Sequence, residues 1–165
     1  MCGIVGYIGK KPVYDILING LKKLEYRGYD SSGVMIYNNE LLVKKSKGKV
    51  SALENLFSNE KDKKGRIGIG HTRWATHGPP NQVNSHPHIS NSGEISLVHN
   101  GIIENYDSIK KILLKKGYTF SSDTDSEVLV NLIEDIKKSK KVKLGKAVYY
   151  ALKQVVGAYA ILVSE

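Results

Sequence analysis

The stretch Met1-Cys2-Gly3-Ile4-Val5-Gly6-Tyr7-Ile8-Gly9 begins the chain, and both a fold and a chemistry can be reasoned outward from it. Cys2 is the only cysteine among the 165 residues. Methionine aminopeptidases remove Met1 when a small residue follows, which would leave Cys2 with a thiol and a free α-amine. An α-amine has a pKa of about 7.7–8.0, so near neutral pH part of it can accept a proton. Pairing a nucleophile with an N-terminal amine activates a weak nucleophile. The alternative is a free cysteine that packs as a small hydrophobic residue.

The pattern of apolar residues around this stretch predicts alternating strands and helices. Residues 3–9 favour a strand that ends in a turn, and their glycines allow other backbone to approach Cys2. Further strands are predicted at 34–37 and 41–44, which form a hairpin, and at 66–71, 95–99 and 158–163. Helices are predicted from Pro12 through Leu24, and at 50–57, 106–116, 124–136 and 144–155.

Helix ends and loops carry more specific signals. Ser51 with Glu54, and Thr124 with Glu127, have the spacing of capping boxes. Asn105 is expected to cap the helix that follows it, and Gly117 to end that helix. Connecting loops are expected at 25–33, 59–65 and 78–93. The last of these is long enough to suggest a lid or a binding loop.

Composition indicates one globular domain in a reducing compartment. Hydrophobic residues make up 41% of the chain and charged residues 25%. A single cysteine excludes an intramolecular disulfide. No apolar run approaches the roughly 20 residues that span a bilayer, and no basic segment precedes the first strand, which excludes a signal peptide. We therefore expect a cytoplasmic protein that does not bind membranes.

The net charge of +9 raises nucleic-acid binding as an alternative function. Only Arg27, Arg66 and Arg73 are arginines, whereas 22 residues are lysines, mostly in pairs. Paired lysines are typical of a solvated surface, and no nucleic-acid-binding signature accompanies them, so we expect no nucleic-acid partner. The scarce arginines are better candidates for planar, bidentate recognition of an anion.

Four polar features at strand and helix ends complement the Cys2 thiol. Attack of a thiol on an amide creates an oxyanion, which a side-chain amide next to a glycine N–H can stabilise, as in Asn100-Gly101. Arg73 suits the carboxylate of an amino acid, and Asp125 in a first helical turn suits its ammonium group. Together these residue types fit cleavage of the side-chain amide of glutamine or asparagine. Asn100-Gly101 is equally a common turn, and Asp125 a common residue in the first turn of a helix.

The histidines offer a third alternative, a metal site. The chain contains five of them, His71, His77, His86, His88 and His99. His86-Pro87-His88 has a spacing that could hold a metal ion, but no cysteine or glutamate-rich segment lies near it in the sequence. The sequence therefore favours the amide-cleaving interpretation over this one.

Five stretches together resemble the glutaminase half of the glutamine–fructose-6-phosphate aminotransferases. They are MCGIVGYIG (1–9), LEYRGYDSSG (24–33), HTRWATHG (71–78), VHNGIIENY (98–106) and SDTDSEV (122–128). The first is shared by the wider class of amidotransferases with an N-terminal cysteine, such as the phosphoribosyl-pyrophosphate amidotransferases. The second and third are specific to the sugar enzymes. The resemblance implies a four-layer αββα sandwich of the N-terminal-nucleophile hydrolase type.

The resemblance also implies catalytic roles. Cys2 is similar to the family's nucleophile, with its α-amine as the base, and Asn100 and Gly101 are similar to the oxyanion hole. The thiol would form a γ-glutamyl thioester, release ammonia and be freed by water. No cofactor and no metal are implied.

The substrate-binding roles follow from the same resemblance. Arg73 is expected to hold the α-carboxylate of glutamine with help from Thr76 and His77, and Asp125 to hold the ammonium group. Trp74 is expected to belong to a mobile loop that closes over glutamine and guards the exit of ammonia.

The resemblance further implies a longer parent enzyme, a homodimer whose sugar isomerase half binds fructose 6-phosphate. We expect residues 2–165 to be a glutaminase domain that is incomplete at its C-terminus and lacks the isomerase domains. Two alternatives stay open: an inactive fragment that merely binds glutamine, and the glutaminase domain of a related amidotransferase.

Overall fold

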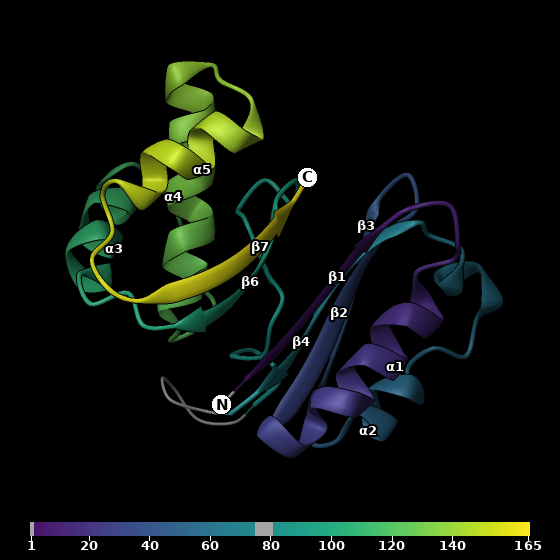
Figure 1. Ribbon diagram of the computed structural model, residues 1–165. Coiled ribbons are helices and arrows are strands. Elements are labelled where there is room, and N and C mark those ends of the chain that lie inside the picture. Colours follow the sequence, from purple (N-terminus) through teal and green to yellow (C-terminus); the bar gives the residue numbers. More distant parts are fainter. Residues whose placement is uncertain (1, 75–80) are drawn as a thin grey trace.

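The computed structural model describes residues 2–74 and 81–165, which form two β-sheets enclosed by helices (Figure 1). The strands are β1 (Gly3–Ile8), β2 (Ser31–Tyr37), β3 (Leu41–Lys47), β4 (Ile67–Arg73), β5 (His88–Ile89), β6 (Ser96–Gly101) and β7 (Tyr159–Ser164). The helices are α1 (Tyr14–Leu24), α2 (Val50–Glu54), α3 (Tyr106–Lys115), α4 (Asp125–Lys140) and α5 (Leu144–Leu152), with 3₁₀ turns at Glu25–Arg27 and Glu60–Lys63.

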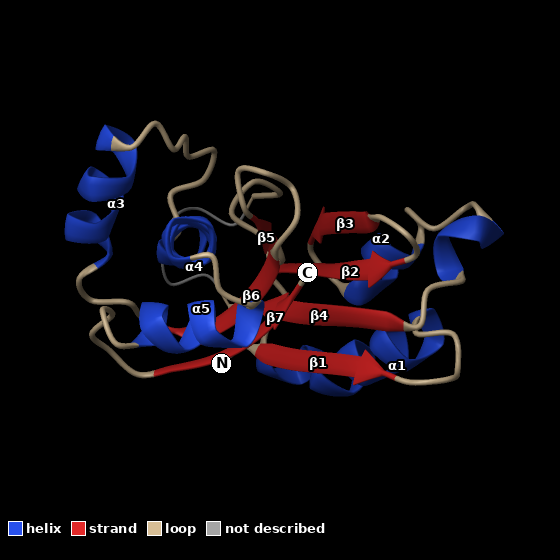
Figure 2. Cartoon of the chain, turned by 90° about the horizontal axis from the view of Figure 1, so that it is seen from above, coloured by secondary structure: helices blue, strands red, loops and turns tan. Residues whose placement is uncertain are grey.

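The two sheets are antiparallel and face each other. The first has the strand order β1-β4-β2-β3 and the second β5-β6-β7. Helices α1 and α2 cover the outer face of the first sheet, and α3, α4 and α5 lie on the far side of the second (Figures 1 and 2). These layers confirm the predicted αββα sandwich. None of the helices in the described part of the chain has the length and apolar character needed to cross a membrane.

Side chains alternate between the two faces of each strand, and the apolar residues on these faces form three layers. Val34 and Ile36 of β2 pack with α1 and α2, whereas Met35 between them points to the opposite face and packs with Ile69 and Val98 between the sheets. The third layer joins the second sheet to α3, α4 and α5. Because successive strand residues face opposite sides, each sheet buries both faces.

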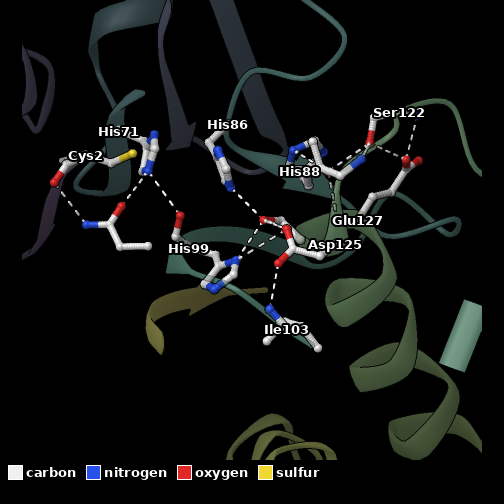
Figure 3. A network of polar contacts seen from close by, with 12 residues as sticks. Cys2, His71, His86, His88, His99, Ile103, Ser122, Asp125 and Glu127 are labelled. Carbon is white, nitrogen blue, oxygen red and sulfur yellow. Dashed lines mark hydrogen bonds and ion pairs between the residues drawn. The ribbon is translucent and has the colours of Figure 1, made fainter. Parts of the chain in front are cut away.

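The fold brings the predicted site residues to one end of the sandwich. Strands β1 and β4 are antiparallel, with Gly3 paired to Thr72, so the start of β1 lies beside the end of β4. The Gly3 N–H also donates a hydrogen bond to the Thr72 hydroxyl over 3.2 Å. The end of β6, in the second sheet, and the start of α4, which packs against that sheet, lie at the same end of the molecule (Figure 3).

Two predictions about helix and loop boundaries were wrong. The expected 25–33 loop contains a 3₁₀ turn and the first residues of β2. Ser51 and Glu54 do not form a capping box, because Lys49 occupies the N-cap position. The Val50 N–H instead donates to the Glu25 carboxylate over 2.7 Å, and Glu54 pairs with Lys22 over 2.8 Å.

Other capping signals were confirmed in part. The Thr124 hydroxyl accepts the Glu127 N–H over 3.3 Å as predicted, but the Glu127 carboxylate accepts bonds from Ser121 and Ser122 instead of returning to Thr124. Asn105 holds the N-cap position of α3 without a capping bond. Its side chain binds the backbone of residues 154 and 156, so it joins α3 to the segment before β7. The expected 78–93 loop contains β5.

Candidate active site

A cleft of about 340 Å³ lies where the two sheets meet at the N-terminal end of β1. This volume is at the lower end of the range for small-molecule sites and suits a ligand of amino-acid size. It is lined by Cys2, Arg27, Arg73, Trp74, His86, His99, Asn100, Gly101, Ile102, Thr124, Asp125 and Ser126. Six of the eight predicted site residues therefore share one cleft.

Cys2 is held at the cleft by contacts with both sheets. Its Sγ accepts a hydrogen bond from the Trp74 N–H over 3.2 Å, which ties it to the end of β4. Its carbonyl oxygen accepts a bond from the Asn100 side-chain amide over 3.1 Å, which ties it to the end of β6 (Figure 3). The thiol therefore lies beside the amide that was predicted to stabilise an oxyanion.

Arg73 supplies positive charge at the end of β4, and only 4% of its surface is exposed. Burial lowers the pKa of its guanidinium, while the charges of Cys2, Asp30 and Asp125 act in the opposite direction. An arginine stays protonated despite such a shift because its ordinary pKa is above 12. The cleft thus contains a fixed cation suited to a carboxylate.

Asp125 supplies negative charge at the first residue of α4 and is 4% exposed. Its Oδ2 accepts the Ile103 N–H over 2.8 Å, and its Oδ1 accepts the Ser126 hydroxyl over 3.4 Å (Figure 3). The helix dipole also favours a carboxylate at this end. With Arg73 and Asp125 on its walls, the cleft is complementary to a zwitterionic amino acid.

Asn100 and Gly101 are the last two residues of β6, where they pair with Ala160 and Tyr159 of β7. The alternative that they form an ordinary turn was therefore wrong. Gly101 has a φ of +126°, and a Cβ atom there would lie 2.1 Å from the Ala158 carbonyl oxygen. Only glycine fits this position, since both its conformation and its surroundings exclude a side chain.

Four histidines pack together between the sheets, and two of them, His86 and His99, line the cleft. The His86 ring lies 4.2 Å from that of His71 and 4.7 Å from that of His88, measured between centroids. The Ser126 hydroxyl is within 2.9 Å of His86 Nε2 and 2.8 Å of His99 Nδ1. Burial lowers the pKa of His71 to about 4 and lowers those of His86 and His88 well below their usual range.

This histidine cluster (His71, His86, His88 and His99) contains four of the five histidines that were considered as metal ligands. Within residues 2–74 and 81–165, no group of three or more His, Cys, Asp or Glu side chains is arranged to hold a metal ion. The rings contact one another. His86, His88 and His99 also bond to hydroxyl groups, whereas His71 bonds to carbonyl oxygens. His77, the fifth member of the predicted metal set, lies outside the described residues.

One lysine departs from the predicted solvated surface. Lys45 of β3 extends its ammonium group into the segment that carries His86 and His88, where it donates to the carbonyl oxygens of Ser85 over 2.7 Å and Val83 over 3.3 Å. Burial lowers the pKa of Lys45 to about 8, and the charge of Glu127 opposes that shift. Lys45 therefore anchors this segment between the sheets.

The remaining substrate-binding predictions concern the loop after β4. Trp74 is 47% exposed at the mouth of the cleft, with its ring edge-on to Tyr29 at 6.0 Å between centroids. Thr76 and His77 lie outside the described residues, so their expected contacts stay predictions. Arg27, another of the three arginines, lines the cleft as well.

The fold and this cleft define a class of amide-cleaving domains with a cysteine at the start of the chain. The family model described as "Glutamine amidotransferase domain" matches residues 56–163, and the chain belongs to this family. The predicted recognition of a glutaminase domain is thereby confirmed.

Curated relatives make the family assignment more specific. The chain is 60% identical to the glutamine–fructose-6-phosphate aminotransferase [isomerizing] of Bacteroides thetaiotaomicron, over all of this chain and 27% of the relative. It is 53% identical to the enzyme of the same name from Chlorobaculum tepidum, over 99% of this chain and 27% of the relative. The chain thus spans about a quarter of the length of the curated relatives it matches.

Solved structures support the same fold. The glutamine phosphoribosylpyrophosphate amidotransferase from B. subtilis, complexed with ADP and GMP, matches with a TM-score of 0.82 at 30% identity, over 99% of this chain and 35% of that one. A glutamine aminotransferase class-II domain protein from Silicibacter pomeroyi matches with a TM-score of 0.65 at 15% identity, which supports the fold alone.

Proposed function

We propose that this chain is a glutaminase domain in which Cys2 cleaves the side-chain amide of glutamine. The observation that carries the proposal is the shared cleft of Cys2, Arg73, Asn100 and Asp125, which come from distant parts of the sequence. The cleft offers a nucleophile, an anion-binding group, an amide donor and a cation-binding group in a space of amino-acid size.

The reaction follows from this arrangement. Arg73 binds the α-carboxylate of glutamine and Asp125 its ammonium group, which presents the side-chain amide to Cys2. The thiol attacks the amide carbon while the α-amine of the processed chain accepts its proton, directly or through a water. Asn100 Nδ2 and the Gly101 N–H stabilise the oxyanion. The amine then returns the proton to the leaving nitrogen, ammonia departs, and water hydrolyses the γ-glutamyl thioester to glutamate.

The wider activity is proposed from the relatives. Their name specifies transfer of an amino group to fructose 6-phosphate with isomerisation. We propose that residues 2–165 supply ammonia to a sugar isomerase module that makes glucosamine 6-phosphate, within a cytoplasmic homodimer. The 60% identity to the sugar enzyme against 30% to the phosphoribosyl-pyrophosphate enzyme favours the sugar acceptor.

Release of glutamate from glutamine tests the proposal directly. Purified protein with Cys2 at its terminus should hydrolyse glutamine, and a form that retains Met1 should not, because its Cys2 nitrogen is an amide and cannot act as a base. A glutamine-mimicking electrophile should add its mass once, at Cys2. Protein that binds glutamine without releasing glutamate would instead be the glutamine-binding remnant and would contradict the proposal.

Replacing Arg73 with lysine should weaken glutamine binding. Lysine keeps the charge but cannot form two parallel hydrogen bonds with a carboxylate. Loss of one charged hydrogen bond costs about 1.5–3 kcal/mol, so KM should rise by about 10- to 100-fold. The control is Arg66→Lys, since Arg66 is exposed and does not line the cleft. Equal KM values for the two variants would exclude the proposed role of Arg73.

A further inference from the structure

His71 lies directly behind the Asn100 side chain, on β4. Its Nε2 is 2.8 Å from Asn100 Oδ1 and 3.2 Å from the His99 carbonyl oxygen (Figure 3). The His99 carbonyl oxygen can only accept a hydrogen bond, so the hydrogen resides on Nε2 whichever way the Asn100 amide faces. The other ring nitrogen, Nδ1, is buried and has no hydrogen-bond partner in the described part of the chain.

The surroundings of His71 keep its ring neutral. The side chain is 1% exposed, and burial lowers its pKa to about 4. A neutral imidazole carries one N–H, and the contacts of Nε2 determine that this hydrogen is not on Nδ1. The ring therefore presents a single donor toward Asn100 Oδ1 at neutral pH.

This donor determines which way the Asn100 amide faces. The two ends of an amide have nearly the same shape, so packing alone discriminates poorly between them. With Oδ1 directed to His71, Nδ2 is directed to Cys2, where it donates to the Cys2 carbonyl oxygen over 3.1 Å. A flipped amide would place the Asn100 oxygen against the Cys2 carbonyl oxygen, and the Asn100 NH₂ group against the N–H of His71.

We propose that His71 is a positioning residue that holds the Asn100 amide with its NH₂ group toward the reacting atoms. His71 is not among the described residues that line the cleft, so it acts through Asn100 and not on glutamine. The inference rests on the proposed glutaminase function and specifies how its oxyanion donor is oriented.

Two substitutions at one position separate the N–H donor from the volume of the ring. His71→Phe keeps a flat ring and removes the donor, whereas His71→Gln places an amide N–H near the position of Nε2. We expect His71→Phe to lower kcat by about 100- to 1,000-fold, as for loss of an oxyanion-hole donor, with KM within about threefold. His71→Gln should recover most of kcat. Equal loss in both variants, or none in His71→Phe, would overturn the proposal.

A double-mutant comparison tests whether His71 acts through Asn100. In an Asn100→Ala background, His71→Phe should change kcat by no more than about twofold, because the group that it orients is gone. The same large factor in both backgrounds would indicate a general structural role and overturn the proposal. Alkylation of Cys2 by iodoacetamide forms no oxyanion, so its rate should be unchanged by His71→Phe.

Nitrogen-15 NMR of the unmodified protein keeps the proposal testable if His71→Phe does not fold. The His71 ring should show the Nε2–H tautomer from pH 7.5 to pH 5.5. An Nδ1–H tautomer, or a charged ring at pH 6.5, would overturn the inference about His71 alone. Unmodified protein that folds but does not hydrolyse glutamine would instead remove the proposed function.

Discussion

Cys2→Ala should abolish glutamine hydrolysis, with kcat lower by about 10⁴-fold or more, as for other removed nucleophiles. The fold should survive, because Cys2 is only partly buried and its Sγ contacts the backbone of Trp74 rather than the apolar core. Glutamate release measures the first expectation and thermal unfolding the second. Glutamine binding, measured by calorimetry, should persist because Arg73 and Asp125 are unchanged.

Cys2→Ser is the matched control for the loss of the thiol. It keeps a hydroxyl in nearly the same place and the same α-amine, but a hydroxyl is a much weaker nucleophile than a thiol at neutral pH. Serine should therefore retain at most a small fraction of kcat. Turnover in Cys2→Ala close to that of the unmodified protein would show that another group attacks the amide.

The fold was largely predictable because its strands and helices follow simple periodicities. The hairpin at β2 and β3 needed only two apolar runs around a polar turn, and α4 needed only its apolar stripe and Thr124. The capping box at Ser51 failed because Glu25, distant in sequence, supplies the bond to the Val50 N–H instead. Local spacing cannot show that a residue distant in the sequence will accept such a hydrogen bond.

The candidate site was predictable to the extent that its chemistry resides in single residue types. The unique cysteine, a rare arginine and an Asn-Gly pair each stand out in the sequence. The hydrogen bonds of His71 and Ser126 did not stand out in the sequence. They form only where β4 of the first sheet lies beside β6 of the second sheet and the start of α4. Lys45 was missed for the same reason, since nothing in a lysine pair indicates that one ammonium group is buried.

Acid should unfold this protein through its histidine cluster. His71 has a pKa of about 4 in the folded chain, against about 6.5 when exposed in the unfolded chain. Between those values the unfolded state binds the proton and the folded state does not. The stabilisation is therefore complete above pH 6.5 and is lost as the pH falls toward 4. For His71 alone the loss is about 3 kcal/mol.

His86 and His88 add to this effect in the same direction, because burial lowers the pKa of both. Each histidine that remains neutral in the folded state contributes a slope of about 1.4 kcal/mol per pH unit below pH 6. Three such histidines would remove about 6 kcal/mol between pH 6 and pH 4.5, which is a large part of the unfolding free energy of about 5–15 kcal/mol that domains have. Urea unfolding at pH 7.5, 6.5, 5.5 and 4.5 measures the slope.

The His88→Gln variant separates the pH dependence caused by the histidine cluster from that caused by other titrating groups. Glutamine can keep the hydrogen bond that His88 Nε2 makes to the Thr124 hydroxyl over 3.0 Å, but it takes up no proton. The slope between pH 6.5 and 4.5 should therefore fall by about 1.4 kcal/mol per pH unit. Burial raises the pKa of Glu134, but its hydrogen bonds with Lys138 and Ser92 outweigh burial and lower the pKa to about 2. Glu134 therefore loses most of its contribution below pH 4.5, and because it is present in both proteins it does not change the difference between their slopes. An unchanged slope in His88→Gln would mean that the buried ring is already protonated in the folded protein.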